Sequence, residues 1–232
     1  MQASVNIIPK PTLVKEGKGS FLVTDGMNIG VNDPALADAA DYLKQMIARA
    51  TGFQDLAVRR GEGHISLLLQ PAADPEDESY TLTVSSSRIT IKAGTYRGVV
   101  NGISTLRQLL PDEIESREPV KGIRWTVPVV QVQDKPAYHW RGLMLDPSRH
   151  FYSVEETEQF LDHMALYKYN KFHWHLTDGV AWRLQINRYP LLTQRGAWRE
   201  FRQDIDINCE NRAKAENNPT LLIPQKYCRE EN

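Results

Sequence analysis

Two short apolar runs in the middle of the chain each end in an acidic residue. Leu143–Leu145 leads into Asp146, a helical stretch follows, and the run from Phe172 ends at Asp178. Strand, helix and strand, with a carboxylate at the end of each strand, is typical of a barrel or a doubly wound sheet. In such folds the active site lies at the carboxyl ends of parallel strands. We therefore expect the chemistry of this chain near Asp146 and Asp178.

Arg141 stands just inside the first of these strands. Its guanidinium carries several N–H donors in a fixed fork, which suits the vicinal hydroxyls of a sugar. A structural pairing with a barrel carboxylate such as Asp146 is the alternative, and the two roles can coexist. His150, which follows Ser148 and Arg149, is a candidate for the rim of the same site. Asp178 can take part in the same site or, as the alternative, can cap a loop by accepting from nearby backbone N–H groups.

His173 and His175 alternate along the second strand and should point to one face. Two histidines at this spacing can bind a metal, but no third ligand stands at a convincing distance and no HExxH motif occurs. We therefore predict packed, hydrogen-bonded histidines, no metal site and no cofactor. Aromatic residues in the first strands of a barrel usually pack between sheet and helix, so most members of one set of tryptophans are predicted to be core residues rather than sugar-stacking ones, the set being Trp140, Trp174, Trp182 and Trp198.

The ordered series of short motifs in this region is more specific than the pattern of runs. It consists of Trp140-Arg141-Gly142, Leu145-Asp146, Ser148-Arg149-His150-Phe151, His173 to Asp178, Trp182-Arg183, Tyr189-Pro190 and Gly196-Ala197-Trp198-Arg199. The series resembles the opening of the catalytic barrel of family 20 glycoside hydrolases, the β-N-acetylhexosaminidases. The resemblance is strong over residues 136–200, and residues 1–135 look like the smaller α+β domain that precedes the barrel in that family.

The resemblance implies an exo-acting retaining hydrolase that removes terminal β-linked GlcNAc or GalNAc from glycans, with the substrate's own 2-acetamido oxygen as nucleophile. It also implies a carbohydrate partner. Arg141 matches an arginine that holds the far hydroxyls of the terminal sugar, and Asp178 matches an acid that organises the hydrogen bonds of the site. The chain departs from the family after Asp178, where Gly179, Val180 and Ala181 replace a second acid and a glutamine; this should alter one rim of the pocket.

The same resemblance shows what this chain lacks. The family's catalytic Asp-Glu pair ends the fourth barrel strand, and only two barrel strands are recognisable here. Adjacent acids occur at Asp77-Glu78 and Asp112-Glu113, but both pairs lie in the first domain and are predicted to face solvent. We therefore expect the N-terminal portion of an enzyme, inactive by itself. The alternative is a non-catalytic interaction or scaffolding module, or an inactive truncated gene product.

Periodicity along the chain predicts the fold class. An α+β N-terminal domain, a sheet with two helices, is expected over residues 1–135, and the start of a (β/α)8 TIM barrel, truncated after about two strands, over 136–232. The two helices of the first domain are predicted from Asn32-Asp33-Pro34 to Gly52 and from Thr95 to Pro111. Strands are predicted at 64–70, 80–84, 89–91 and 125–132, and an exposed loop at 112–122. Ser153 and Glu156 predict a capping box at the start of a barrel helix whose buried stripe is Phe160, Met164 and Tyr167.

Charge and hydropathy argue against two further classes of protein, those that bind nucleic acid and those that span a membrane. The formal net charge of −1 argues against a nucleic-acid partner, and no apolar stretch is long enough for a membrane span. We expect a periplasmic or secreted protein whose signal peptide has been removed, with a cytoplasmic one not excluded. Cys209 and Cys228 can be a free pair or a disulfide. Two barrel strands leave open edges, which could support self-association.

Overall fold

The structure is a computed structural model that describes residues 5–179, 181–197, 199–200 and 224–225. Its chain divides into two compact units. The first consists of Met1–Arg141 together with Asp162–Asn170, and the second of Gly142–Leu161 together with Lys171–Asn232. The segment 162–170 therefore packs with the first unit although it lies between the strands of the second. Cys209 and Cys228 lie outside the described residues.

A seven-stranded sheet forms the base of the first unit, in the order β1-β7-β5-β6-β4-β2-β3. β2, β3, β4 and β6 pair in parallel, whereas β5 pairs antiparallel with β6 and β7, and β1 pairs antiparallel with β7. The strands are β1 (Leu13–Leu22), β2 (Asn28–Val31), β3 (Ala57–Arg60), β4 (Ile65–Leu69), β5 (Tyr80–Val84), β6 (Ile89–Ala93) and β7 (Thr126–Asp134).

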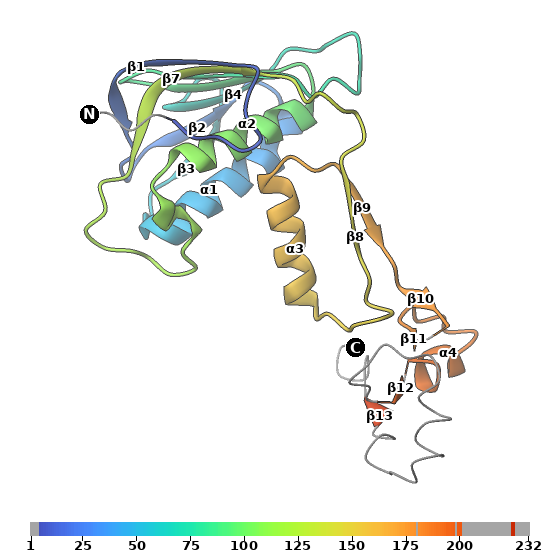
Figure 1. The fold of residues 1–232 in the computed structure, drawn as a ribbon. Coiled ribbons are helices and arrows are strands. Elements are labelled where there is room, and N and C mark those ends of the chain that lie inside the picture. The colour runs from blue at the N-terminus through green and yellow to red at the C-terminus, as the bar shows by residue number, and fades with distance from the viewer. Residues whose placement is uncertain (1–4, 180, 198, 201–223, 226–232) are drawn as a thin grey trace. The chain divides into compact units, whose positions relative to one another are not determined.

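Two helices cover one face of this sheet (Figure 1). α1 (Ala37–Thr51) follows the short 3-10 helix η1 (Pro34–Leu36), whose start is capped because the Asp33 carboxylate accepts from the Ala35 N–H at 2.9 Å. α1 ends at Gly52, where φ is 75°, a left-handed conformation that glycine adopts at little cost. The sequence thus carries both the start and the stop of the first helix.

α2 (Tyr96–Leu109) begins at Thr95, whose hydroxyl accepts from the Gly98 N–H at 3.2 Å. Gly98 is needed for space, since a Cβ there would lie 2.5 Å from the carbonyl oxygen of Ser79. Between the two helices and the sheet lies the hydrophobic core. Its largest fully buried side chains are Phe21, Ile29, Leu36, Leu43, Ile47, Ile65, Leu67, Leu82, Ile89, Ile91, Ile103 and Leu106.

The second unit contains a parallel pair of strands, and the helix that joins them belongs to this unit up to Leu161 and to the first unit from Asp162. β8 (Gly142–Leu145) and β9 (Lys171–Trp174) pair with Gly142 opposite Lys171 and Leu145 opposite Trp174. α3 (Val154–Leu166) is the crossover that a parallel pair requires. The remaining elements are β10 (Thr177–Asp178), β11 (Ala181–Trp182), α4 (Leu191–Gln194), β12 (Arg199–Glu200) and β13 (Pro224–Gln225).

The start of α3 has the predicted capping box. The Ser153 hydroxyl accepts from the Glu156 N–H at 3.2 Å, and the Glu156 carboxylate accepts from the Ser153 N–H at 2.8 Å. Two orphan donors of the first turn are therefore satisfied reciprocally. Of the predicted buried stripe, Met164 is buried and Phe160 half-buried, but Tyr167 follows the end of the helix and is exposed.

The predicted fold class, an α+β domain with two helices followed by the beginning of a barrel, is confirmed. Both first-domain helices and the β5–β6 hairpin lie where periodicity placed them. Strands β1 to β3 were not predicted. β1 and β3 are largely exposed and carry charged residues, and β2 is a buried run of only four residues. The expectation of an exposed loop at 112–122 is wrong at η2 (Asp112–Glu115), where Ile114 is buried. The domain limit at residue 135 stays a prediction.

Candidate functional site

The carboxyl ends of β8 and β9 carry a cluster of charged side chains. Asp146 follows β8 directly, and His175 follows β9 directly. The main-chain ladder continues one step past the strands, because His175 N–H donates to Leu145 O at 2.9 Å and Ser148 N–H donates to His175 O at 3.3 Å. The two loops that leave these strands are thereby held side by side. We call Asp146, Arg149, His175 and Asp178 the edge cluster.

Arg149 is the centre of the edge cluster. Its Nη1 lies 2.9 Å from Asp146 Oδ2, and its Nη2 lies 2.8 Å from Asp178 Oδ2. The Arg149 main-chain N–H also donates to Asp146 Oδ1 at 3.1 Å. The arginine is therefore held from two loops at once, yet 51% of its side chain is exposed. An arginine held in this way has a fixed orientation and still presents N–H donors to solvent.

His175 lies between the two carboxylates. Its Nδ1 is 3.4 Å from Asp146 Oδ2 and its Nε2 is 3.3 Å from Asp178 Oδ2. Arg149 Nη1 lies 3.0 Å from Nδ1 and can donate to that nitrogen where it carries no proton. The rings of His173 and His175 are 6.0 Å apart, on one face as predicted. In the part of the chain that the structure describes, no group of three or more His, Cys, Asp or Glu side chains is placed to hold a metal ion.

Asp178 is an ionised acceptor in this arrangement. The Gly179 N–H donates to its Oδ1, and this bond, followed by the charges of Arg149 and His175, lowers the pKa of the Asp178 carboxyl below its ordinary value. A carboxylate held ionised cannot supply a proton near neutral pH. Asp178 thus has the geometry of the predicted loop cap, and the same contacts suit the predicted supporting role, which stays a prediction.

Buried polar contacts form the base below the edge cluster. The Ser148 hydroxyl donates to Ala181 O at 2.7 Å, and Arg183 donates through Nε to Pro147 O at 2.9 Å and through Nη1 to Ala197 O at 2.7 Å. Ser148 is fully buried and Arg183 is 9% exposed. The loop that carries Arg149 is therefore fixed from beneath, which favours a preformed site.

Arg141 lies in a different setting, within the first unit. Its Nη2 donates to Glu78 Oε2, its Nε to Lys168 O at 2.7 Å, and its Nη1 to Tyr138 O. Asn170 Nδ2 donates to the other oxygen of Glu78, at 2.9 Å. We call Glu78, Arg141 and Asn170 the inner cluster. The carboxylate partner of Arg141 is Glu78, not Asp146, and the sugar-binding role of Arg141 stays a prediction.

The inner cluster corrects the interpretation of the adjacent acids. Glu78 was predicted to face solvent, but its side chain is 7% exposed and is paired with Arg141 and Asn170. Nothing in the local sequence marks it as buried, because its partners are distant along the chain. Its neighbour Asp77 behaves as a local cap: the Ser79 hydroxyl donates to it at 2.8 Å and lowers the pKa of the Asp77 carboxyl.

The structure also shows the surroundings of His150 and the exposure of the predicted core tryptophans. The His150 ring packs edge-on against Tyr152 at 5.0 Å and is exposed, so its rim role stays a prediction. The expectation of core tryptophans is wrong for Trp140 and Trp174, which are 74% and 50% exposed. Trp182 is half-buried and donates to Leu184 O, and Trp198 lies outside the described residues.

A largely apolar cavity of about 810 Å³ lies on the other side of β9. Phe172, Trp174 and Leu176 line it together with residues of α3, whereas His173 and His175 alternate with them along the strand. None of the four edge-cluster residues lines this cavity. The polar face and the apolar face of β9 are therefore separate, and the candidate site lies on the polar one.

Sequence reasoning missed Arg149 and gave His175 only a packing role. The signal was present in two spacings, Asp146 to Arg149 and His175 to Asp178, each three residues apart in the loops that follow parallel strands. Since such loops meet at one edge of a sheet, two charged pairs at the same distance from two strand ends were candidates for one cluster.

Comparison with known proteins gives a consistent result. The chain matches “Glycosyl hydrolase family 20, domain 2” over residues 4–135 and “Glycosyl hydrolase family 20, catalytic domain” over residues 138–220. A beta-hexosaminidase of Porphyromonas gingivalis is 39% identical over 199 residues, which are 84% of this chain and 25% of that protein.

Solved structures agree with the sequence matches. The N-acetyl-beta-hexosaminidase of Streptomyces plicatus in complex with Thio-NAglucal superimposes with a TM-score of 0.74 at 38% identity, over 82% of this chain and 38% of that chain. The exo beta-N-acetylglucosaminidase of Vibrio harveyi in complex with N-acetylglucosamine gives a TM-score of 0.73 at 31% identity, over 85% of this chain and 30% of that chain. The chain thus spans between 25% and 38% of the length of these three relatives.

Proposed function

We propose, from the premise that the chain belongs to glycosyl hydrolase family 20, that it is the front portion of an exo-acting β-N-acetylhexosaminidase. The substrate class is a glycan with a terminal β-linked GlcNAc or GalNAc, and the reaction is substrate-assisted, retaining hydrolysis. The relatives named above, and the N-acetylglucosamine bound to one of them, support this assignment. The second unit of the chain would provide one side of the sugar site.

The edge cluster is the observation that carries the proposal. A half-exposed guanidinium held by Asp146 and Asp178 can donate two directed hydrogen bonds to neighbouring sugar hydroxyls. The carboxylates can accept from further hydroxyls, since ionised oxygens have more than one acceptor site. The cluster therefore suits binding and orientation of a neutral, polyhydroxylated ligand.

Between the two arginines, the geometry favours Arg149 as the sugar-binding one. All three guanidinium nitrogens of Arg141 already donate to protein acceptors, and its side chain is 15% exposed. Because the Arg141 side chain is largely buried, a ligand hydroxyl would reach its remaining N–H donors less readily than those of Arg149, which is 51% exposed. Sugar binding by Arg141, as the resemblance implied, is the rival hypothesis.

Proton donation falls to groups outside these two clusters. Asp178 is held ionised by Gly179 N–H and Arg149, and Glu78 is paired in the interior. We therefore expect the 232-residue chain to show no turnover of a chromogenic β-N-acetylglucosaminide. Turnover that disappears when a single acid of this chain is changed would contradict the assignment of roles.

A chimera tests the proposal directly. Residues 5–197 of this chain would replace the matching part of the Streptomyces plicatus enzyme, and hydrolysis of the chromogenic substrate would be measured. We expect activity, and a loss of about 10- to 100-fold in kcat/KM for Arg149→Met, since a hydrogen bond to a charged group contributes about 1.5–3 kcal/mol. Arg88→Met is the matched control, because Arg88 is an exposed arginine of the first unit, paired with Glu62 at 2.6 Å.

The same chimera separates the two arginines. Arg141→Met should lower activity only as far as it lowers the folded fraction, whereas sugar binding by Arg141 requires a raised KM in fully folded protein. A chimera that folds at the host's Tm and does not hydrolyse the substrate would contradict the proposal.

A self-associating module is the second candidate. Among the described residues, β8 and β9 pair only with each other, and Met144 and Trp174 are 53% and 50% exposed on them. Open parallel edges with apolar side chains favour pairing with another copy. Sedimentation velocity over a concentration series tests this: a monomer at every concentration would contradict it.

No helix among the described residues is long and apolar enough to cross a bilayer.

A further inference from the structure

One carboxylate of the first unit holds the starting points of both barrel strands. Glu78 Oε2 accepts from Arg141 Nη2, and Glu78 Oε1 accepts from Asn170 Nδ2 at 2.9 Å. Arg141 is the residue directly before β8, and Asn170 is the residue directly before β9. The two oxygens of a single buried side chain are therefore divided between two strands that lie far from it in sequence.

The backbone at this point extends the β8–β9 ladder by one step. Asn170 N–H donates to Arg141 O at 2.9 Å, and Arg141 N–H donates to the side-chain oxygen of Asn170 at 3.0 Å. Asn170 Nδ2 also donates to His139 O at 2.8 Å. With both ends of its amide engaged, Asn170 can take only one position along Arg141. The pairing of Gly142 with Lys171 follows from it.

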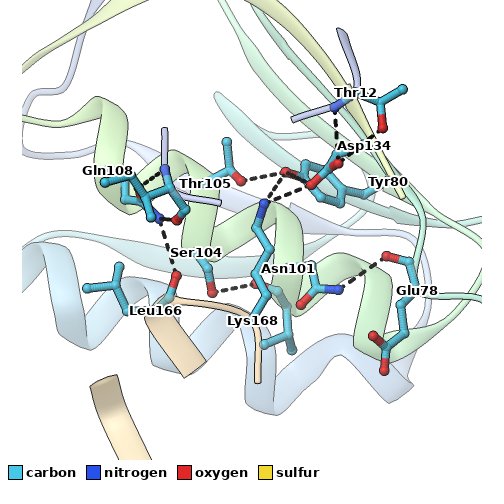
Figure 2. Close-up of polar contacts among 12 residues, drawn as sticks. Thr12, Glu78, Tyr80, Asn101, Ser104, Thr105, Gln108, Asp134, Leu166 and Lys168 are labelled. Carbon is cyan, nitrogen blue, oxygen red and sulfur yellow. Dashed lines mark hydrogen bonds and ion pairs between the residues drawn. The ribbon is translucent and has the colours of Figure 1, made fainter. Parts of the chain in front are cut away.

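Glu78 itself is anchored on rigid elements. Its main-chain oxygen accepts from Asn101 Nδ2 of α2 at 3.2 Å, as Figure 2 shows. The Thr95 hydroxyl, which also caps α2, donates to Asp77 O. Gly98 lets the same helix approach Ser79 closely. The carboxylate is thus fixed between the start of α2 and the start of β5.

A second buried ion pair holds the turn before β9. Lys168 Nζ lies 2.9 Å from Asp134 Oδ2 and 2.8 Å from the Tyr80 hydroxyl (Figure 2). The side chains of Lys168 and Asp134 are 2% and 9% exposed. Lys168 O is the acceptor for Arg141 Nε at 2.7 Å, so this pair and the inner cluster are connected. The segment 162–170 is therefore fixed to the first unit at two charged points.

We propose that Glu78 is a positioning residue that sets the register of β8 against β9 and thereby the placing of Arg149 against Asp178 at the other end of these strands. A pair of four-residue strands has few ladder bonds of its own and specifies its register weakly. Because side chains alternate along a strand, a slip of one residue would turn His173 and His175 to the opposite face. The inference concerns the geometry of the edge cluster and does not depend on which ligand binds there.

The experiment uses the full chain and the variant Glu78→Gln, which removes the charge and keeps the shape. Amide hydrogen exchange would be followed in β8 and β9, with β4 and β6 as internal references, and the pKa of Asp178 would be followed by NMR of its carboxyl carbon. We expect exchange at least about tenfold faster in β8 and β9 than in the wild type, with β4 and β6 unchanged. The pKa of Asp178 should rise toward its ordinary value, because Arg149 is no longer held against it.

The matched control is Glu115→Gln. Glu115 pairs with Arg107, a buried arginine of the first unit whose partners are remote from β8 and β9 in sequence, so its loss should leave both readouts unchanged. Uniformly faster exchange in all four strands, or an unchanged Asp178 pKa, would show that Glu78 is merely structural and would overturn the proposal.

Asn170→Ser keeps the proposal testable if Glu78→Gln does not fold. This variant removes the amide bridge but leaves Glu78 paired with Arg141, so no unpaired charge is buried. The same selective increase in exchange is expected, to a smaller extent, and its absence would overturn the proposal. Because neither readout involves a sugar, failure of the proposed enzymatic function would leave these outcomes unchanged.

Discussion

The inner cluster and the edge cluster are built from the same kinds of group and differ in burial. Each has an arginine on a carboxylate, with an amide or an imidazole beside it. In the inner cluster Arg141 and Glu78 are 15% and 7% exposed, whereas in the edge cluster Arg149 and Asp178 are 51% and 37% exposed. The first arrangement is suited to holding the chain and the second to exchanging a protein partner for a ligand.

Because the two ion pairs differ in burial, they should differ in the free energy that breaking them costs. A buried ion pair is expensive to break because the remaining charge has no solvent, while an exposed pair is worth little since water and salt replace it easily. Arg141 and Arg149 stand on either side of the same strand, β8. Arg141 therefore fixes the start of β8, and the placing of Arg149 beyond the end of β8 depends on that fixed start.

The largest effect that this comparison predicts is a difference in unfolding free energy between two fragments, residues 1–135 and residues 1–170. Residues 1–135 lack Arg141, Lys168 and Asn170, so Glu78 and Asp134 would lose their buried partners. Residues 1–170 keep all of them. We expect 1–170 to be more stable than 1–135 by roughly 3–5 kcal/mol, the cost of leaving a buried charge unpaired, measured by urea unfolding. Equal midpoints and slopes would mean that the first unit is complete at residue 135.

Arg141→Met and Arg149→Met form the most direct comparison between the clusters. Arg141→Met leaves Glu78 buried and unpaired and should cost about 3–5 kcal/mol of unfolding free energy. Arg149→Met removes contacts from carboxylates that are 26% and 37% exposed, and should leave the unfolding free energy close to that of the wild type. Chemical denaturation of both variants measures this. A similar loss in the two variants would contradict the distinction drawn here.

Local sequence predicted the elements of the fold and the strand ends, and it failed where a partner is distant in sequence. The Ser153–Glu156 box and the helix end at Gly52 depend on neighbours a few residues away, and both are confirmed. Glu78 looks like any acid in a charged loop, since its burial depends on Arg141, 63 residues later. The edge was predicted at Asp146 and Asp178, but no local rule distinguishes Arg149 from Arg141.

Gly98 and Gly179 allow the same comparison for the backbone next to each cluster. At Gly98 a Cβ would lie 2.5 Å from Ser79 O and 2.8 Å from Ala93 Cβ, so Gly98→Ala must displace the segment that carries Glu78. At Gly179, beside Asp178, a Cβ meets no atom within 4 Å. We expect a loss of about 1–3 kcal/mol for Gly98→Ala and almost none for Gly179→Ala, measured by thermal unfolding. Destabilisation by both would show that the edge loop is as tightly packed as the interior.

The smallest expected effect concerns the protonation of Asp178. Its pKa is lowered chiefly by the Gly179 N–H, and then by the charges of Arg149 and His175. A depressed pKa in the folded state means a stabilisation that is present above the unfolded-state value, about 3.9 for aspartate, and is lost as the pH falls through the folded value. In Arg149→Met the pKa of Asp178 should rise but stay below its ordinary value, because the largest cause remains. NMR titration of the Asp178 carboxyl carbon in both proteins measures this. An unchanged pKa would show that Arg149 is not held against Asp178 in solution, and the edge cluster would then lack the preformed arginine on which its proposed role in sugar binding depends.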